Sequence, residues 1–121
     1  MTEAEMDRLV DRHFRAEERS DVEGTVADLA EDVVHELAGH HRSSTRDDAR
    51  AFYRGLFGQL RLKRINSTRR LYGPDFLVDE AVVDAETTSG QPSPFRLLHI
   101  FQFEDGRISH ESAWRAPLES E

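Results

Sequence analysis

Histidine is the residue whose placement in this chain most clearly suggests chemistry. If residues 95–103 form a strand, every second side chain lies on the same side, and this side carries Phe95, Leu97, His99, Phe101 and Phe103. All of these residues are apolar except His99. A single titratable imidazole on an apolar face is either a hydrogen-bonded core residue or part of a small-molecule site. Because burial disfavours the cation, we expect a neutral ring that donates from one nitrogen and accepts at the other.

Two further histidines interrupt apolar patterns. His13 falls in a helical stripe, and His35 lies with apolar residues on one face of a short strand, where it could act as a base. His13 could instead turn its polar end to water, and each could be a satisfied core residue. His40 and His41 are adjacent in a loop and match neither an H-x-H nor an HExxH spacing. We therefore expect neither a metal ion nor a cofactor.

The composition excludes several classes of protein. The chain has 121 residues, which is the size of one domain with one core. Its formal net charge is −8 and it shows no basic face, so a nucleic-acid partner is not expected. The absence of cysteine excludes disulfides and thiolate metal sites. No apolar run approaches membrane-spanning length and the first residues do not resemble a signal peptide, so we expect a cytoplasmic protein without a membrane partner.

Apolar periodicity predicts three helices. The first spans residues 3–18 and the second residues 21–31, which we expect to begin at a capping box formed by Ser20 and Glu23. The third spans 45–59 and carries a broad aromatic stripe. Together with residues of the last strands, this stripe is expected to form the core or the wall of a cavity: Phe52, Tyr53, Phe57, Phe101, Phe103 and Trp114.

Period-2 patterns and turn residues predict the strands. A short strand at 33–37 precedes the third helix, and four more follow it at 61–72, 76–88, 95–104 and 107–116. The last two are expected to pair through the turn Glu104-Asp105-Gly106. This order describes an α+β domain, in which three N-terminal helices pack on a curved, mainly antiparallel sheet. Such a sheet, covered on one side, forms a cone whose apolar interior can hold a ligand.

Several stretches, in their order along the chain, resemble the nuclear transport factor 2-like superfamily, and within it the SnoaL-like polyketide cyclases and the ketosteroid isomerases. The segment 20–36, SDVEGTVADLAEDVVHE, is similar to the family's pattern of a small residue, an aspartate, a helix and a strand. The segment 48–57, DARAFYRGLF, is similar to its third helix, and 101–108, FQFEDGRI, to its final hairpin. The resemblance covers essentially the whole chain and implies a single domain, residues 1–121.

The resemblance also implies which positions face the pocket. Ketosteroid isomerases have a catalytic aspartate where this chain has Leu37, so the usual base is missing. His13 stands in place of their oxyanion-hole tyrosine, and His99 in place of their protonated aspartate. A gapless comparison turns the face carrying Asp84 toward the pocket, where its carboxylate could fix the tautomer of His35 or His99. The alternative for Asp84 is a solvated strand edge.

Two functions from different classes fit these residues. The first is an enzyme that binds a hydrophobic, carbonyl-containing compound and uses histidine-centred acid–base chemistry for isomerisation, cyclisation or dehydration. The second is a non-catalytic ligand-binding or dimeric structural domain, for which Leu37 is the main argument. In either case we expect a homodimer packed sheet to sheet, because Leu98 and Ile100, with Val83 and Ala85, would leave a wide apolar face in water.

Overall fold

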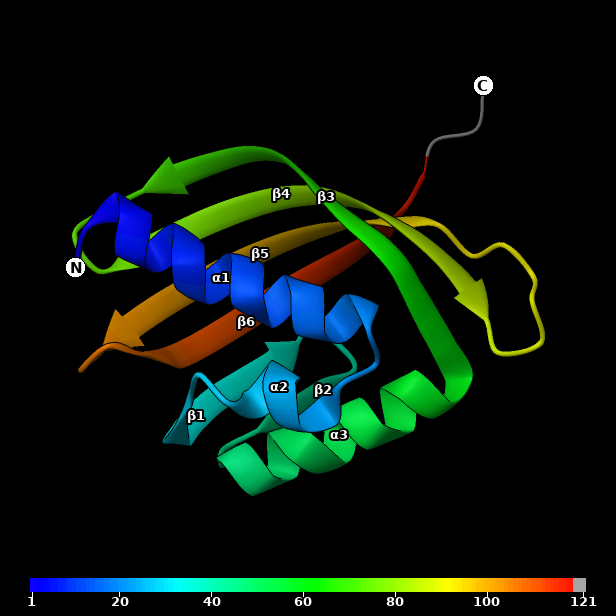
Figure 1. Ribbon diagram of the computed structural model, residues 1–121, viewed down its shortest axis with the longest axis horizontal. Coiled ribbons are helices and arrows are strands. Elements are labelled where there is room, and N and C mark those ends of the chain that lie inside the picture. Colours follow the sequence, from blue (N-terminus) through cyan, green and yellow to red (C-terminus); the bar gives the residue numbers. More distant parts are fainter. Residues whose placement is uncertain (119–121) are drawn as a thin grey trace.

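The sheet in the computed structural model, which describes residues 1–118, is strongly curved and carries its helices on the concave side (Figure 1). In chain order the elements are α1 Glu3–Glu18, α2 Val22–Val26, β1 Leu29–Leu37, β2 His41–Ser43, α3 Arg46–Gln59, β3 Leu60–Tyr72, β4 Phe76–Thr87, β5 Phe95–Glu104 and β6 Arg107–Pro117. The strand order is β2-β1-β6-β5-β4-β3, and every pair is antiparallel except β1–β6. The expected α+β class is confirmed.

The helix boundaries follow local capping, with one correction. Thr2 caps α1 in a capping box with Glu5, and the Thr45 side chain caps α3 by accepting from the amide of Asp48. The predicted start and length of the second helix are wrong. Its N-cap is Asp21, and Ser20 has a positive φ of 52° outside the helix.

The second helix ends early because a tertiary contact takes over. Residues 29–31, predicted as helix, belong to β1, where Leu29 pairs with Ile108 of β6. Part of the predicted loop that follows is also a strand, β2, which pairs with the end of β1. Pairing with a distant strand thus outweighs the weak helical pattern of this segment.

The predicted final hairpin is confirmed, and it contains a bulge that decides which residues face inward. Asp105 and Gly106 both have positive φ, as a two-residue hairpin turn with the strand twist requires. The register then shifts by one residue, since Phe103 pairs with Ile108 whereas Gln102 pairs with His110. Such a bulge reverses the alternation of faces along the rest of the strand.

Two residues predicted to face the pocket lie on the opposite face of the sheet, for different reasons. Trp114 was expected at the pocket but lies on the outer, convex face of the sheet with 42 % of its surface exposed. On β4, Val83 and Ala85 are buried under the helices, so Asp84 is exposed on the outer face instead of facing the pocket. No bulge in β4 causes this difference. Apolar residues occupy both faces of this part of the strand, so the sequence does not indicate which face is buried, and the pairing of β4 in the sheet decides it.

A cluster of ion pairs that extends from buried Asp79 to the surface fixes α1 to the sheet. Arg70 of β3 contacts the carboxylates of Asp7 and Asp11 on α1 and of Asp79 on β4, at 2.9, 2.7 and 2.8 Å. Since Asp79 is fully buried, its charge requires such a partner. The cluster holds the helix that supplies His13 in one position over the sheet.

No helix within residues 1–118 combines the length and hydropathy needed to cross a membrane. The cytoplasmic location and the homodimer stay predictions.

Candidate functional site

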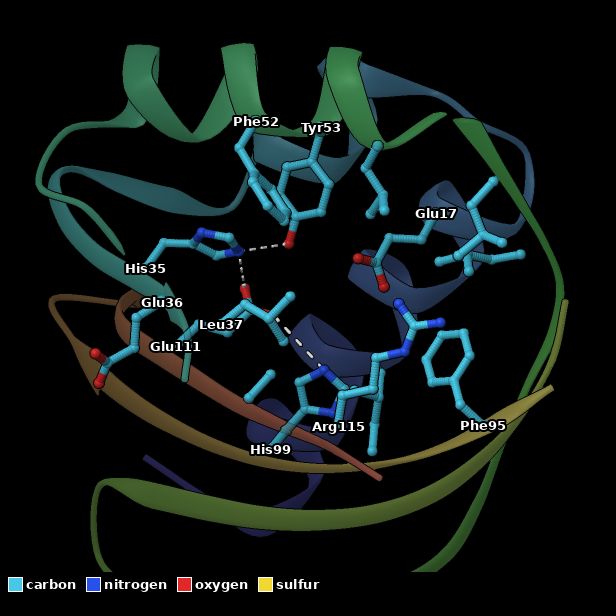
Figure 2. A pocket seen from close by; sticks show the side chains of 15 residues that line it. Glu17, His35, Glu36, Leu37, Phe52, Tyr53, Phe95, His99, Glu111 and Arg115 are labelled. Carbon is cyan, nitrogen blue, oxygen red and sulfur yellow. Dashed lines mark hydrogen bonds and ion pairs between the residues drawn. The ribbon is translucent and has the colours of Figure 1, made fainter. Parts of the chain in front are cut away.

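A cavity opens between α3 and the inner face of the sheet, with an apolar wall and a polar floor (Figure 2). Its volume is about 60 Å³, measured as the space open to the centre of a water molecule. At about 10–15 Å³ per water, this is room for a few waters or the reactive end of a small organic molecule. The floor consists of Glu17, His35, Tyr53, His99 and Glu111; apolar lining residues include Phe52, Leu56, Leu60, Leu62, Phe95 and Leu97.

The structure brings some of the predicted residues to this cavity and separates others from it. Those that line it are His35, His99, Leu37, Phe52 and Tyr53. His13, Phe101 and Phe103 are buried beside or below the floor, and Phe57 is half-buried against the core. Asp84 and Trp114 lie on the other face of the sheet, as described above.

Glu111 is the centre of the polar floor. The sheet register places it opposite His35 of β1 on one side and Phe101 of β5 on the other. Three imidazole nitrogens surround its carboxylate, with Nε2 of His13 at 3.2 Å, of His99 at 3.8 Å and of His35 at 4.0 Å. The Glu111 side chain is almost completely buried, so these rings replace water as its surroundings.

The contacts of His13 require both of its ring nitrogens to carry a proton. Nδ1 lies 2.8 Å from the carbonyl oxygen of Thr25, which can only accept, and Nε2 lies 3.2 Å from the Glu111 carboxylate. Burial alone would lower the pKa of His13, but the carboxylates of Glu111 and Glu17 raise it to about 10. The expectation of a neutral ring, drawn from burial, is therefore wrong for His13.

The pKa of Glu111 shifts in the opposite sense. Burial would raise it, yet the charge and hydrogen bond of His13, together with His35 and His99, hold it well below the ordinary value. Glu111 and His13 are thus a buried carboxylate–imidazolium pair. Only Oε2 of Glu111 meets hydrogen-bond geometry, and Oε1 has no hydrogen-bond partner among the described residues.

His35 and His99 behave as expected for buried rings. Burial lowers the pKa of His99 to about 4 and also lowers that of His35, and Glu111 only partly opposes this. Both rings are therefore neutral at pH 7. His35 Nε2 lies 3.0 Å from the Tyr53 hydroxyl, and neither ring has a partner for Nδ1 within residues 1–118. Each imidazole thus retains a nitrogen with which a ligand could hydrogen-bond.

Glu17 and Tyr53 complete the floor. Burial raises the pKa of Glu17 to about 7, so its carboxyl group can exchange a proton near neutrality. Burial and the two carboxylates hold the pKa of Tyr53 well above its ordinary value, so the hydroxyl stays protonated. Within the part of the chain that the structure describes, no three of these groups are arranged as metal ligands.

Sequence reasoning missed Glu17 and Glu111 for different reasons. Glu17 is four residues after His13, so helical periodicity alone could have placed both side chains on one face of the helix. Glu111 follows the β6 bulge, which no pattern in the sequence predicts. Only the folded register brings it within reach of His13, 98 residues away.

Comparison with known proteins agrees with this architecture. The family model of the SnoaL-like domain matches residues 10–111. The chain belongs to the SnoaL-like domain family. This confirms the resemblance of the whole chain to the nuclear transport factor 2-like superfamily. No curated protein sequence matches the chain significantly.

Solved structures similar to this SnoaL-like domain carry several different activities in their names. An LEH-like epoxide hydrolase of M. tuberculosis is 19 % identical, with a TM-score of 0.81, covering 93 % of this chain and 84 % of its own. A protein of Xanthomonas campestris pv. campestris, provisionally named a polyketide cyclase, is 22 % identical, with a TM-score of 0.80 and coverages of 92 % and 90 %. A Bacillus subtilis protein provisionally named an isomerase is 15 % identical, with a TM-score of 0.87 and coverages of 97 % and 91 %. At these identities the likeness establishes the fold alone.

Proposed function

We propose that this SnoaL-like domain is an enzyme that binds a small hydrophobic carbonyl compound and transfers a proton at the carbon next to the carbonyl group. The observation that carries the proposal is the convergence of a proton-exchanging carboxyl group and two neutral imidazoles on one apolar cavity. An enzyme requires such titratable groups within reach of a single substrate, whereas a domain that had lost its chemistry would not keep them together.

The two neutral imidazoles are the groups that recognise the carbonyl. Each of His35 and His99 keeps an unpartnered buried nitrogen, and their Nε2 atoms are too far from Glu111 for a hydrogen bond. The substrate oxygen can accept the N–H of neutral His99. It can also accept from the pair formed by His35 and Tyr53: either the Nδ1–H of His35 donates to it while Nε2 accepts from Tyr53, or Nε2–H donates to Tyr53 and the tyrosine hydroxyl donates to the substrate. The same donors stabilise negative charge that develops on the oxygen during the reaction.

Glu17 is the group that moves the proton. Because its pKa is raised to about 7, part of the population is a carboxylate at neutral pH and part is the acid. The carboxylate takes a proton from the carbon next to the carbonyl, and the electron pair of that C–H bond moves toward the carbonyl oxygen. Return of the proton at another carbon gives an isomer, while closure onto a second carbonyl or loss of hydroxide gives a cyclised or dehydrated product.

The pair formed by Glu111 and His13 has a positioning role in this proposal. Glu111 is held as a carboxylate by the charge and hydrogen bond of His13, with His35 and His99 nearby, and is therefore a weak base. Its charge attracts the N–H groups of His35 and His99 across 4.0 and 3.8 Å. His13 in turn lies 3.9 Å from Glu17 and limits how far burial raises the pKa of that carboxyl group.

A deuterium-exchange experiment tests the enzyme proposal without knowledge of the natural substrate. The protein is incubated in D₂O with a panel of hydrophobic aryl and alkyl ketones, and loss of the proton signal next to the carbonyl is followed by NMR. We expect exchange above the buffer rate for part of the panel. We expect His99→Ala and Glu17→Gln to slow it at least about tenfold, since general acid–base groups contribute about 10²–10⁴-fold.

His110→Ala is the control, because this half-buried ring lies outside the cavity and contacts Ser112. It is expected to exchange like the wild type. Ketones that bind, by saturation-transfer NMR, but exchange no faster than in buffer would support the alternative of a non-catalytic ligand-binding domain. Leu37, at the position of the family's base, is the residue that argues for that alternative.

We further propose that the domain is a homodimer packed through the outer face of its sheet. Two of the four residues expected on this face are not there, since Val83 and Ala85 are buried under the helices. Leu98 lies there as expected with 36 % of its surface in solvent, as does half-buried Ile100, and Trp114, 42 % exposed, lies beside them.

A further inference from the structure

Arg115 is an exposed residue that lines the cavity at its opening. The β6 bulge turns this residue to the inner face, where it pairs with Leu97 in the register. Its guanidinium carbon lies 4.0 Å from the centre of the Phe95 ring, which also lines the cavity (Figure 2). This cation–π contact holds the arginine against the wall of the cavity.

Within residues 1–118 the Arg115 guanidinium has no carboxylate partner at ion-pair distance, and the group it contacts is the Phe95 ring. The carboxyl groups that line the cavity are paired elsewhere or partly protonated. Glu111 is paired with the His13 cation, and Glu36 with Arg42. Burial raises the pKa of Glu17 to about 7, so this group is partly protonated at neutral pH. Arg115 is therefore a cation in the lining that a bound anion can neutralise.

We infer that the cavity takes a hydrophobic keto acid, whose carboxylate binds Arg115 while its ketone reaches the imidazoles on the floor. The planar guanidinium can donate two parallel N–H hydrogen bonds to the two oxygens of a carboxylate, which is a bidentate contact. Between the two ends the wall is apolar and consists of Leu60, Leu62, Leu97 and Phe95. The position of the ketone rests on the proposed function, whereas the position of the carboxylate does not.

A pair of probes with the same body tests this inference. 3-Benzoylpropionate carries an aryl ketone and a carboxylate, and 3-benzoylpropionamide replaces only the charged group by a neutral amide. Both are titrated into the wild-type protein by calorimetry or NMR. We expect the acid to bind at least about tenfold more tightly than the amide, the size of one charge-assisted contact at a partly exposed site.

Variants assign that preference to one side chain. Arg115→Gln is expected to weaken binding of the acid and to leave binding of the amide unchanged, so that the ratio of the two affinities falls to about one. Arg115→Lys is expected to retain part of the preference for the acid. Arg8→Gln makes the same change of charge at an exposed position of α1 and should keep the wild-type ratio. Equal affinities for acid and amide in the wild type, an unchanged ratio in Arg115→Gln, or no binding of either probe would each overturn the inference.

The same two probes separate this inference from the proposed enzyme. If the amide exchanges its proton in D₂O but the acid shows no preference in binding, the proton-transfer proposal stands and the keto-acid specificity is wrong. If the acid is preferred through Arg115 but neither probe exchanges, the anion-binding role stands and the enzyme proposal is wrong.

Discussion

Replacement of Glu111 by glutamine removes the carboxylate from the centre of the site and keeps the size of the side chain. In the wild type the pKa of His13 is raised to about 10, chiefly by this carboxylate acting against burial. In the variant the buried ring loses its partner and must give up its proton on folding. We therefore expect Glu111→Gln to lower the free energy of unfolding.

The size of the effect follows from the pKa of His13. The ring is protonated at pH 7 in the folded protein, and pH 7 lies three units below its pKa of about 10. At about 1.4 kcal/mol per unit, the pair contributes at most about 4 kcal/mol. Glutamine avoids the cost of burying the carboxylate charge, which offsets part of this contribution. We therefore expect the free energy of unfolding at pH 7 to fall by about 2–4 kcal/mol, which overlaps the range of about 3–5 kcal/mol typical of breaking a buried ion pair.

The pH dependence identifies the cause. The folded pKa of His13 lies above the unfolded value, so the stability it gives is complete below the ordinary histidine pKa of 6.5 and is lost as the pH rises through about 10. The lowered pKa of Glu111 gives stability that is present above 4.5 and is lost as the pH falls toward about 2. The difference in the free energy of unfolding between wild type and variant should therefore be largest between about pH 4.5 and 6.5, and should become smaller at lower and at higher pH.

Urea unfolding followed by circular dichroism at pH 6, 8 and 10 measures this difference. Glu104→Gln changes an exposed carboxylate at the end of β5 and should leave stability within about 0.5 kcal/mol of the wild type. A loss in Glu111→Gln that is the same at pH 6 and pH 10, or a loss no larger than that of the control, would refute the ion pair.

Two further predictions concern Glu17 and the assembly. Because the pKa of Glu17 is raised from 4.5 to about 7, the folded state favours its protonated form, and stability falls as the pH rises through this range. Glu17→Gln should stabilise the protein at pH 8 by up to about 3 kcal/mol but change little at pH 4.5, measured by urea unfolding; an equal effect at both pH values would contradict the assignment. Light scattering at micromolar concentration should give about twice the chain mass of 13.9 kDa, and Leu98→Asp on the outer face should give the monomer; a wild-type monomer at all concentrations would exclude the dimer.

The elements of the fold were predictable where local chemistry specifies them. The apolar stripe of α1, the Thr45 cap of α3 and the turn at Asp105 and Gly106 are properties of neighbouring residues, and the structure has each of them in place. The inward position of His99 follows from strand alternation for the same reason. Local patterns predict structure when the interactions that stabilise it are themselves local.

The composition of the site was decided by tertiary structure. A one-residue bulge in β6 turns Glu111 and Arg115 inward and Trp114 outward, and the parallel pairing of β1 with β6 brings His35 to Glu111. The protonation of His13 then depends on a carboxylate 98 residues away in the chain. The sequence by itself determined that histidines would lie on apolar faces; which carboxylates they meet depends on register. Register is a property of strand pairing across the whole sheet, and a shift of one residue exchanges the two faces of a strand.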